Sequence, residues 1–209
     1  MKSLLHIIAT PRGDESRTLK VTDAFLGRFK ARYPDCKIDE LNVFTEKLPE
    51  LTAKRVDGKY VLLSGKDLSG EFVGEWKEIV SHIERFMAAD AYLLSTPMWN
   101  LIIPYEMKHY LDVIVQPKYL FRYTDKGPEG MVKGKKILVI TSRGGDYSEG
   151  SPFSNYDMQK VYLPTIFGFI GLKDIAFLNA QPMDALGPKV AEEKINLARG
   201  EAVKLADKF

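Results

Sequence analysis

Residues 135–145 read KKILVITSRGG. Their apolar run follows two lysines and gives the strongest strand prediction in the chain. A Gly-rich loop comes next, and helical spacing of apolar residues resumes over residues 156–170. This part of the chain therefore reads as strand, loop and helix, and another short strand is predicted at residues 174–178.

The same alternation continues toward the N-terminus. Strands are predicted at residues 2–9, 38–43 and 91–95, and apolar side chains spaced three and four residues apart predict helices between them. Pro104 suits a helix start because its missing N–H is not needed there, and a last helix is predicted from Pro188. The helical stripes are Leu19, Thr22, Leu26, Phe29 and Tyr33, then Phe72, Trp76, Ile79, Ile83 and Phe86, then Met107, Leu111 and Ile114.

Two stretches are less regular. Residues 44–70 show only weak helical spacing, at Val56, Tyr60 and Leu63. Residues 119–124 are followed by Gly127 and Pro128, which predicts an excursion with a turn.

Strands that alternate with helices pair in parallel through right-handed crossovers. We therefore expect a three-layer α/β sandwich around a five-stranded parallel sheet. Five strands suit the flavodoxin-like order 2-1-3-4-5, which rests on fold class rather than on periodicity. Because no repeat or linker divides the sequence, residues 1–209 are expected to form a single domain.

Composition narrows the function classes. The chain has 209 residues, 45% of them hydrophobic and 28% charged, as in an ordinary globular protein. Its net charge is only +2, which argues against a nucleic-acid partner. Cys36 is the one cysteine and only three histidines are present, so neither an internal disulfide nor a zinc cluster is expected.

Neither a membrane segment nor a signal peptide is expected. The longest uncharged apolar run, residues 161–172, is shorter than the ~18 residues that a membrane span needs. The apolar run after Lys2 is too short for a signal peptide and lacks a cleavage site. The expected location is the cytoplasm.

Three predicted strands lead into segments whose residue types suit a ligand. They are residues 10–18 (TPRGDESRT), 97–101 (PMWNL) and 142–145 (SRGG). In an open parallel sheet, ligands bind outside the carboxyl ends of the strands, so all three segments would open on one edge. That convergence is more informative than any one segment.

Each segment allows a functional and a purely structural interpretation. The first ends at a predicted helix N-terminus, which binds phosphate well, although Ser16 or Thr18 can simply cap the helix. It matches neither the P-loop nor the GxGxxG dinucleotide pattern. The second combines a thioether, an indole and an amide that suit an isoalloxazine ring, or else Met98 and Trp99 fill the core. The third is either a close backbone approach to a ligand or a plain turn.

At these residues the sequence resembles the FMN-dependent NADH-azoreductases, also called NADH:quinone oxidoreductases, of the flavodoxin-like superfamily. Residues 121–124 (FRYT), 127–130 (GPEG), 135–136 (KK) and 142–145 (SRGG) resemble that family's FRYT…GPxG…GKK…SRGG run. Residues 167–171 (FGFIG) resemble another of its segments. The resemblance covers most of the chain and is weakest over residues 44–70.

The resemblance implies an FMN site with three parts. The phosphate would be held by Thr10, Ser16, Arg17 and Thr18, the ring by Pro97, Met98, Trp99, Asn100 and Leu101, and the pyrimidine edge by Ser142, Arg143, Gly144 and Gly145. Substrate-pocket candidates are Trp99, Phe121 and Tyr123, and no metal is implied. The chain departs from the family pattern PMYNF at Trp99 and Leu101, and has Thr10 where Ser is common. The two loop changes keep an apolar surface but alter the shape expected of the substrate pocket.

The implied mechanism needs no catalytic side chain. NADH or NADPH would reduce the flavin, and a quinone or azo compound would then take its place, giving ping-pong kinetics. His6 and His82 are expected to be structural, whereas His109 lies beyond the flavin loop as an outside candidate. The resemblance also implies a homodimer, with residues 119–123 (YLFRY) as a shared pocket wall or, alternatively, a self-contained part of the core.

Two other functions remain open. A flavodoxin-like electron carrier for a protein partner would usually be strongly acidic, and the net charge of +2 argues against it. A paralogue without flavin is disfavoured by the nearly complete set of contact positions.

Overall fold

The five predicted strands form one parallel sheet. A computed structural model describes all 209 residues and places the strands in the order β2–β1–β3–β6–β7. Their bounds are β1 Ser3–Ile8, β2 Lys37–Asn42, β3 Ala91–Ser95, β6 Lys136–Ser142 and β7 Asp174–Ala180. Counted along the chain, this is the predicted order 2-1-3-4-5, and every neighbouring pair is parallel.

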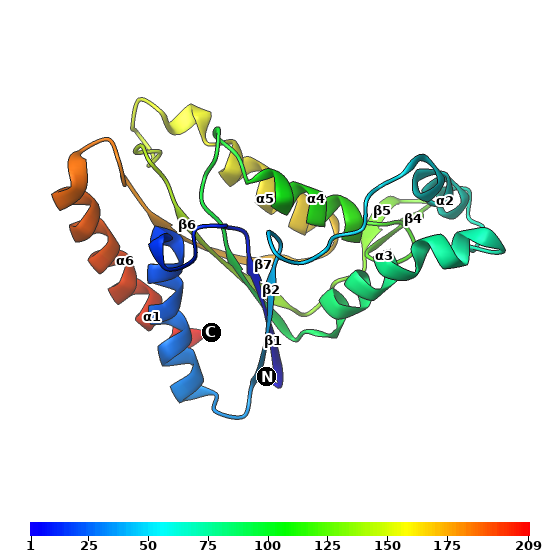
Figure 1. The fold of residues 1–209 in the computed structure, drawn as a ribbon, viewed down its shortest axis with the longest axis horizontal. Coiled ribbons are helices and arrows are strands. Elements are labelled where there is room, and N and C mark those ends of the chain that lie inside the picture. Colours follow the sequence, from blue (N-terminus) through cyan, green and yellow to red (C-terminus); the bar gives the residue numbers. More distant parts are fainter.

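Helices cover both faces of the sheet (Figure 1). On one face lie α1 (Arg17–Arg32) and α6 (Gly187–Lys208), and on the other lie α3 (Glu71–Ala88), α4 (Tyr105–Ile114) and α5 (Met158–Phe169). Successive residues of β1 point to opposite faces. Leu4 accordingly packs with the α1 and α6 residues, and Leu5 packs with those of α3 to α5. The three layers of the predicted sandwich are therefore present.

The irregular segment contains a helix, α2 (Ala53–Leu63). Its existence agrees with the weak periodicity, but the stripe that predicted it faces solvent, because Val56, Tyr60 and Leu63 are exposed. The residues of α2 that are buried are instead Gly58 and Leu62.

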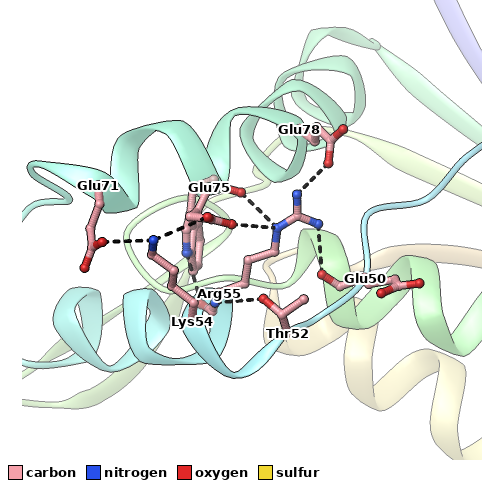
Figure 2. Close-up of polar contacts among 8 residues, drawn as sticks. Glu50, Thr52, Lys54, Arg55, Glu71, Glu75 and Glu78 are labelled. Atoms are coloured by element: carbon pink, nitrogen blue, oxygen red, sulfur yellow. Dashed lines mark hydrogen bonds and ion pairs between the residues drawn. The ribbon is translucent and has the colours of Figure 1, made fainter.

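Polar contacts around Arg55 fasten α2 to α3 (Figure 2). The Arg55 guanidinium donates to the carbonyl oxygens of Glu50 and Glu75, at 2.9 Å each, and to the carboxylate of Glu78 at 2.6 Å. In return, Trp76 Nε1 donates to the carbonyl of Arg55 at 3.0 Å. A helix with an exposed apolar stripe is thus held by polar groups and one buried indole.

The predicted excursion is a β-hairpin beside the main sheet. Its strands, β4 (Phe121–Thr124) and β5 (Gly127–Gly130), are antiparallel. Phe121 is buried against Phe169 of α5, with ring centroids 4.6 Å apart. Two single-turn 3-10 helices, η1 (Gly13–Glu15) and η2 (Ser154–Tyr156), precede α1 and α5. None of the helices combines the length and apolarity that crossing a bilayer requires.

Candidate functional site

The three segments that follow β1, β3 and β6 meet in one pocket of about 170 Å³. The convergence predicted from the strand order is therefore present. The predicted residues Thr18, Asn100, Leu101 and Gly145 do not line this pocket, whereas Arg12, Met183 and Asp184 do and were not predicted. Its lining consists of Thr10, Arg12, Ser16, Arg17, Pro97, Met98, Trp99, Ser142, Arg143, Gly144, Met183 and Asp184.

The first segment presents the N-terminus of α1. Ser16 is the N-cap, and its Oγ accepts the N–H of Leu19 at 3.3 Å, so the capping interpretation is confirmed. The Ser16 hydroxyl still has its own proton to donate. The N–H groups of Arg17 and Thr18 have no acceptor within the protein. Free N–H groups at the positive end of a helix dipole favour an anion such as phosphate.

An acidic side chain already faces this anion site. Arg17 Nη1 donates to Asp184 Oδ1 at 2.5 Å. Asp184 lies between β7 and α6, far along the chain from α1, and no motif marks it. The guanidinium expected to meet a phosphate is thus paired with a carboxylate that is 68% exposed.

The second segment forms a tight two-residue turn. Trp99 and Ile102 exchange backbone hydrogen bonds, each of 3.0 Å. Between them, Asn100 and Leu101 have φ values of 47° and 73°, in the left-handed region, which is costly for leucine. Buried Gln159 of α5 holds the turn, because its N–H donates to Leu101 O at 3.1 Å and its Nε2 to Pro97 O at 3.2 Å.

An aromatic cluster backs this turn. The Trp99 ring lies 5.7 Å from that of Phe44, which lies 5.8 Å from that of Tyr105. Phe44 and Tyr105 were not predicted, because nothing in the sequence joins them to residue 99. Phe121 and Tyr123, by contrast, lie on the hairpin and do not line the pocket of this chain.

The third segment offers backbone donors. The N–H groups of Gly144 and Gly145 have no acceptor within the protein. A Cβ at Gly144 would lie 2.9 Å from Asp184 Oδ2, and one at Gly145 3.3 Å from the Tyr147 ring. Glycine therefore keeps both amides accessible at a crowded place.

Arg143 uses its side chain inside the protein. It is 1% exposed, pairs with Asp157 at 2.5 Å and donates to Thr141 Oγ1 at 3.0 Å. Asp157 also caps α5 by accepting the N–H of Lys160 at 2.8 Å. Arg143 Nη2 has no partner. This ion pair ties the end of β6 to the start of α5, which in turn holds the Trp99 turn through Gln159.

None of the three histidines lines the pocket. His109 Nε2 lies 3.0 Å from the carbonyl oxygen of Pro49 and fixes a loop to α4. Burial lowers the pKa of His82. Burial, together with the charge of Lys30, lowers the pKa of His6 to about 4. Each histidine therefore contributes to the structure of the protein rather than to the pocket.

The chemistry of these donors fits FMN. Free helix N–H groups, hydroxyls and arginines suit a phosphate. The apolar wall of Pro97, Met98 and Trp99 suits a flat ring. The free amides of Gly144 and Gly145 suit the acceptor atoms of a pyrimidine edge.

Comparison with known proteins agrees with this fit. A family model described as "Flavodoxin-like fold" matches residues 2–206. The FMN-dependent NADH:quinone oxidoreductase of Nitratidesulfovibrio vulgaris (strain DP4) is 37% identical over 206 residues, covering 99% of this chain and 97% of that protein. FMN-dependent NADH:quinone oxidoreductase 2 of Pseudomonas syringae pv. tomato is 36% identical, covering 97% of each.

Solved structures give the same result. The azoreductase from Bacillus anthracis str. Sterne superposes with a TM-score of 0.89 at 30% identity, over 100% of both chains. An FMN-dependent NADH-azoreductase from the Ames Ancestor strain, solved in complex with FMN, has a TM-score of 0.87 at 26% identity, over 100% of this chain and 99% of that one. The chain described here therefore belongs to the flavodoxin-like family that includes the FMN-dependent NADH:quinone oxidoreductases and NADH-azoreductases.

Proposed function

We propose that this protein is an FMN-dependent oxidoreductase that uses NADH or NADPH for the two-electron reduction of quinones and the reductive cleavage of aromatic azo compounds. The observation that carries the proposal is the meeting of the α1 N-terminus, an apolar wall and the loop amide of Gly144 in one pocket. The names of the relatives support both substrate classes.

The protein's own groups would bind, orient and exclude water. Bound FMN supplies the site that accepts and donates hydride. Thr10, Ser16, Arg17 and the amide of Thr18 would hold its phosphate. The strained turn at Asn100 and Leu101 would lie along the ring with Met98 and Trp99.

The remaining groups would act on the ring's polar edge and on access to it. The amides of Gly144 and Gly145 would donate to the edge where negative charge develops on reduction, which favours the reduced form. The Phe44–Trp99–Tyr105 cluster would exclude water from one side of the ring. No side chain would form a covalent bond in this scheme, and donor and acceptor would use one site in turn.

We further propose a homodimer in which residues 1–209 of each chain form one flavin-binding domain, located in the cytoplasm. Phe121 and Tyr123 could then reach a pocket only across an interface, because they do not line the pocket of their own chain. The exposed apolar residues Val56, Tyr60 and Leu63 of α2 support an interface on the α2 side.

The runner-up is an electron carrier that binds a protein redox partner. One experiment separates the two. The purified protein is examined by visible absorption, released flavin is identified, and steady-state oxidation of NADH is followed with a quinone. We expect FMN, bleaching by NADH and recolouring by the quinone. Flavin without NADH turnover would favour the carrier, and a protein that cannot be loaded with FMN would overturn both functions.

A further inference from the structure

A chain of buried polar side chains runs under the start of α1. His6 Nε2 lies 2.9 Å from Ser95 Oγ, and Ser95 Oγ lies 2.8 Å from Thr22 Oγ1. Thr22 Oγ1 donates to the carbonyl oxygen of Thr18 at 3.0 Å. All four residues are at most 2% exposed. The chain links β1, β3 and α1 within an otherwise apolar layer.

The carbonyl oxygen at the end of the chain determines which group donates in each hydrogen bond. The carbonyl oxygen of Thr18 can only accept, so the Thr22 hydroxyl must donate to it. Thr22 Oγ1 then accepts the proton of Ser95, and Ser95 Oγ accepts from His6 Nε2–H. The imidazole therefore carries a proton on Nε2. Burial lowers its pKa to about 4, so the ring is neutral near pH 7 and its unpartnered Nδ1 is an acceptor. Every donor in the chain points toward Thr18.

Thr18 is also held from the other side. Its Oγ1 lies 2.7 Å from Ser142 Oγ at the end of β6. The N–H of the same residue is one of the two free donors at the helix N-terminus. The carbonyl and side chain of Thr18 are thus fixed to three central strands. Thr18 itself is buried, and it follows directly on Ser16 and Arg17, which line the pocket.

We propose that His6, Ser95 and Thr22 are positioning residues that hold the first turn of α1 in place for the phosphate of the bound cofactor. The proposal rests on the proposed function, because it needs a phosphate at this turn. Neither His6, Ser95 nor Thr22 lines the pocket, so they would act only through Thr18. Buried groups whose hydrogen bonds all run in one direction favour a single backbone position.

The test compares two flavins that differ in the phosphate. Dissociation constants for FMN and riboflavin are measured with the purified full-length chain and with Thr22→Val, which is nearly isosteric but lacks the hydroxyl. We expect about tenfold weaker FMN binding, within the range for a lost buried hydrogen bond, and unchanged riboflavin binding. Thr22→Ser keeps the hydroxyl and should restore FMN affinity.

A matched control is available in α5. Thr165 Oγ1 makes the same kind of bond, to Val161 O at 2.7 Å, but at an exposed position. Thr165→Val should leave both dissociation constants unchanged. Equal losses for FMN and riboflavin in Thr22→Val would show a merely structural role, and unchanged FMN affinity would also overturn the proposal. A wild-type protein that binds neither flavin would instead overturn the proposed function, and this role with it.

Discussion

At the scale of single residues, the most consequential charge is buried beside the site rather than exposed in it. Arg143 and Asp157 are 1% and 2% exposed, so removing one charge leaves the other without compensation. Asp157→Asn keeps an oxygen to cap α5 and should lower the free energy of unfolding by ~3–5 kcal/mol in urea denaturation. Asp207→Asn, in the exposed pair with Arg28, should cost under ~1 kcal/mol. Equal losses of stability in Asp157→Asn and Asp207→Asn would contradict the importance given to the buried pair.

His6 gives a second prediction at this scale, in the pH dependence of stability. Its pKa is lowered from 6.5 to about 4, chiefly by burial. The folded state therefore resists protonation, and the unfolded chain takes up the proton first as the pH falls. As the pH falls from 6.5 to about 4, the free energy of unfolding should decrease by ~3 kcal/mol from His6 alone.

Urea denaturation across that pH interval measures the effect. His6→Gln can still donate to Ser95 but has no titratable group, so its stability should depend less steeply on pH. Identical slopes for the wild type and His6→Gln would show that the loss of stability arises elsewhere.

Sequence reasoning reached residues in the segments after β1, β3 and β6, and it missed residues that come after β2 and β7. Ser16 and Gly144 could be predicted because each lies within a segment whose residue types suit a ligand. Asp184 and Phe44 could not, since their contacts with Arg17 and Trp99 join distant parts of the chain. Arg143 was expected at the flavin as part of residues 142–145. The role of its side chain depends on Asp157, whose position only the fold defines.

At the scale of elements, α2 depends on a glycine. A Cβ at Gly58 would lie 2.2 Å from Trp76 Nε1, the atom that donates to Arg55 O. Gly58→Ala should lower the free energy of unfolding by ~1–3 kcal/mol through overpacking and change the near-UV circular dichroism of Trp76. Gly74→Ala in α3, where nothing lies within 4 Å, should instead raise stability by ~0.5–1 kcal/mol. A stable Gly58→Ala protein would mean that α2 can shift.

The two helices also show when periodicity is informative. In α3 the predicted residues Trp76, Ile79, Ile83 and Phe86 are all buried, because they belong to the larger hydrophobic core. The predicted Phe72, at the start of the helix, is only half-buried. In α2 the apolar stripe is exposed, since Arg55 and Gly58 make the contacts with α3. A helix that is held by polar bonds and a glycine has no buried apolar face that periodicity could reveal.

At the scale of the whole molecule, the alternation of strands and helices was enough to predict where the candidate pocket lies. Parallel strands bring their carboxyl ends to one edge, whatever the details of each loop. The hairpin could be predicted only as a turn, because its strands are four residues each and pair with one another rather than with the sheet. Because Phe121 and Tyr123 do not line the pocket of their own chain, the hairpin can contribute to such a pocket only through assembly.

The exposed apolar residues of α2 predict where two chains assemble. Tyr60 of α2 is 66% exposed and lines an apolar hollow of about 240 Å³ with Val56, Leu63 and Trp76. Exposed apolar clusters of this kind mark interfaces. Sedimentation velocity should show a dimer of the wild type, and Tyr60→Glu should weaken it by about tenfold or more, as at an interface hot spot.

Leu197 on α6 provides the matched control, because it is 65% exposed but lies on the opposite face of the sheet. Leu197→Glu should leave the dimer intact. If that variant dissociates and Tyr60→Glu does not, the interface lies on the α1–α6 face and the hairpin cannot complete a partner's pocket. A wild type that is monomeric at every concentration would leave Phe121 and Tyr123 outside any substrate pocket.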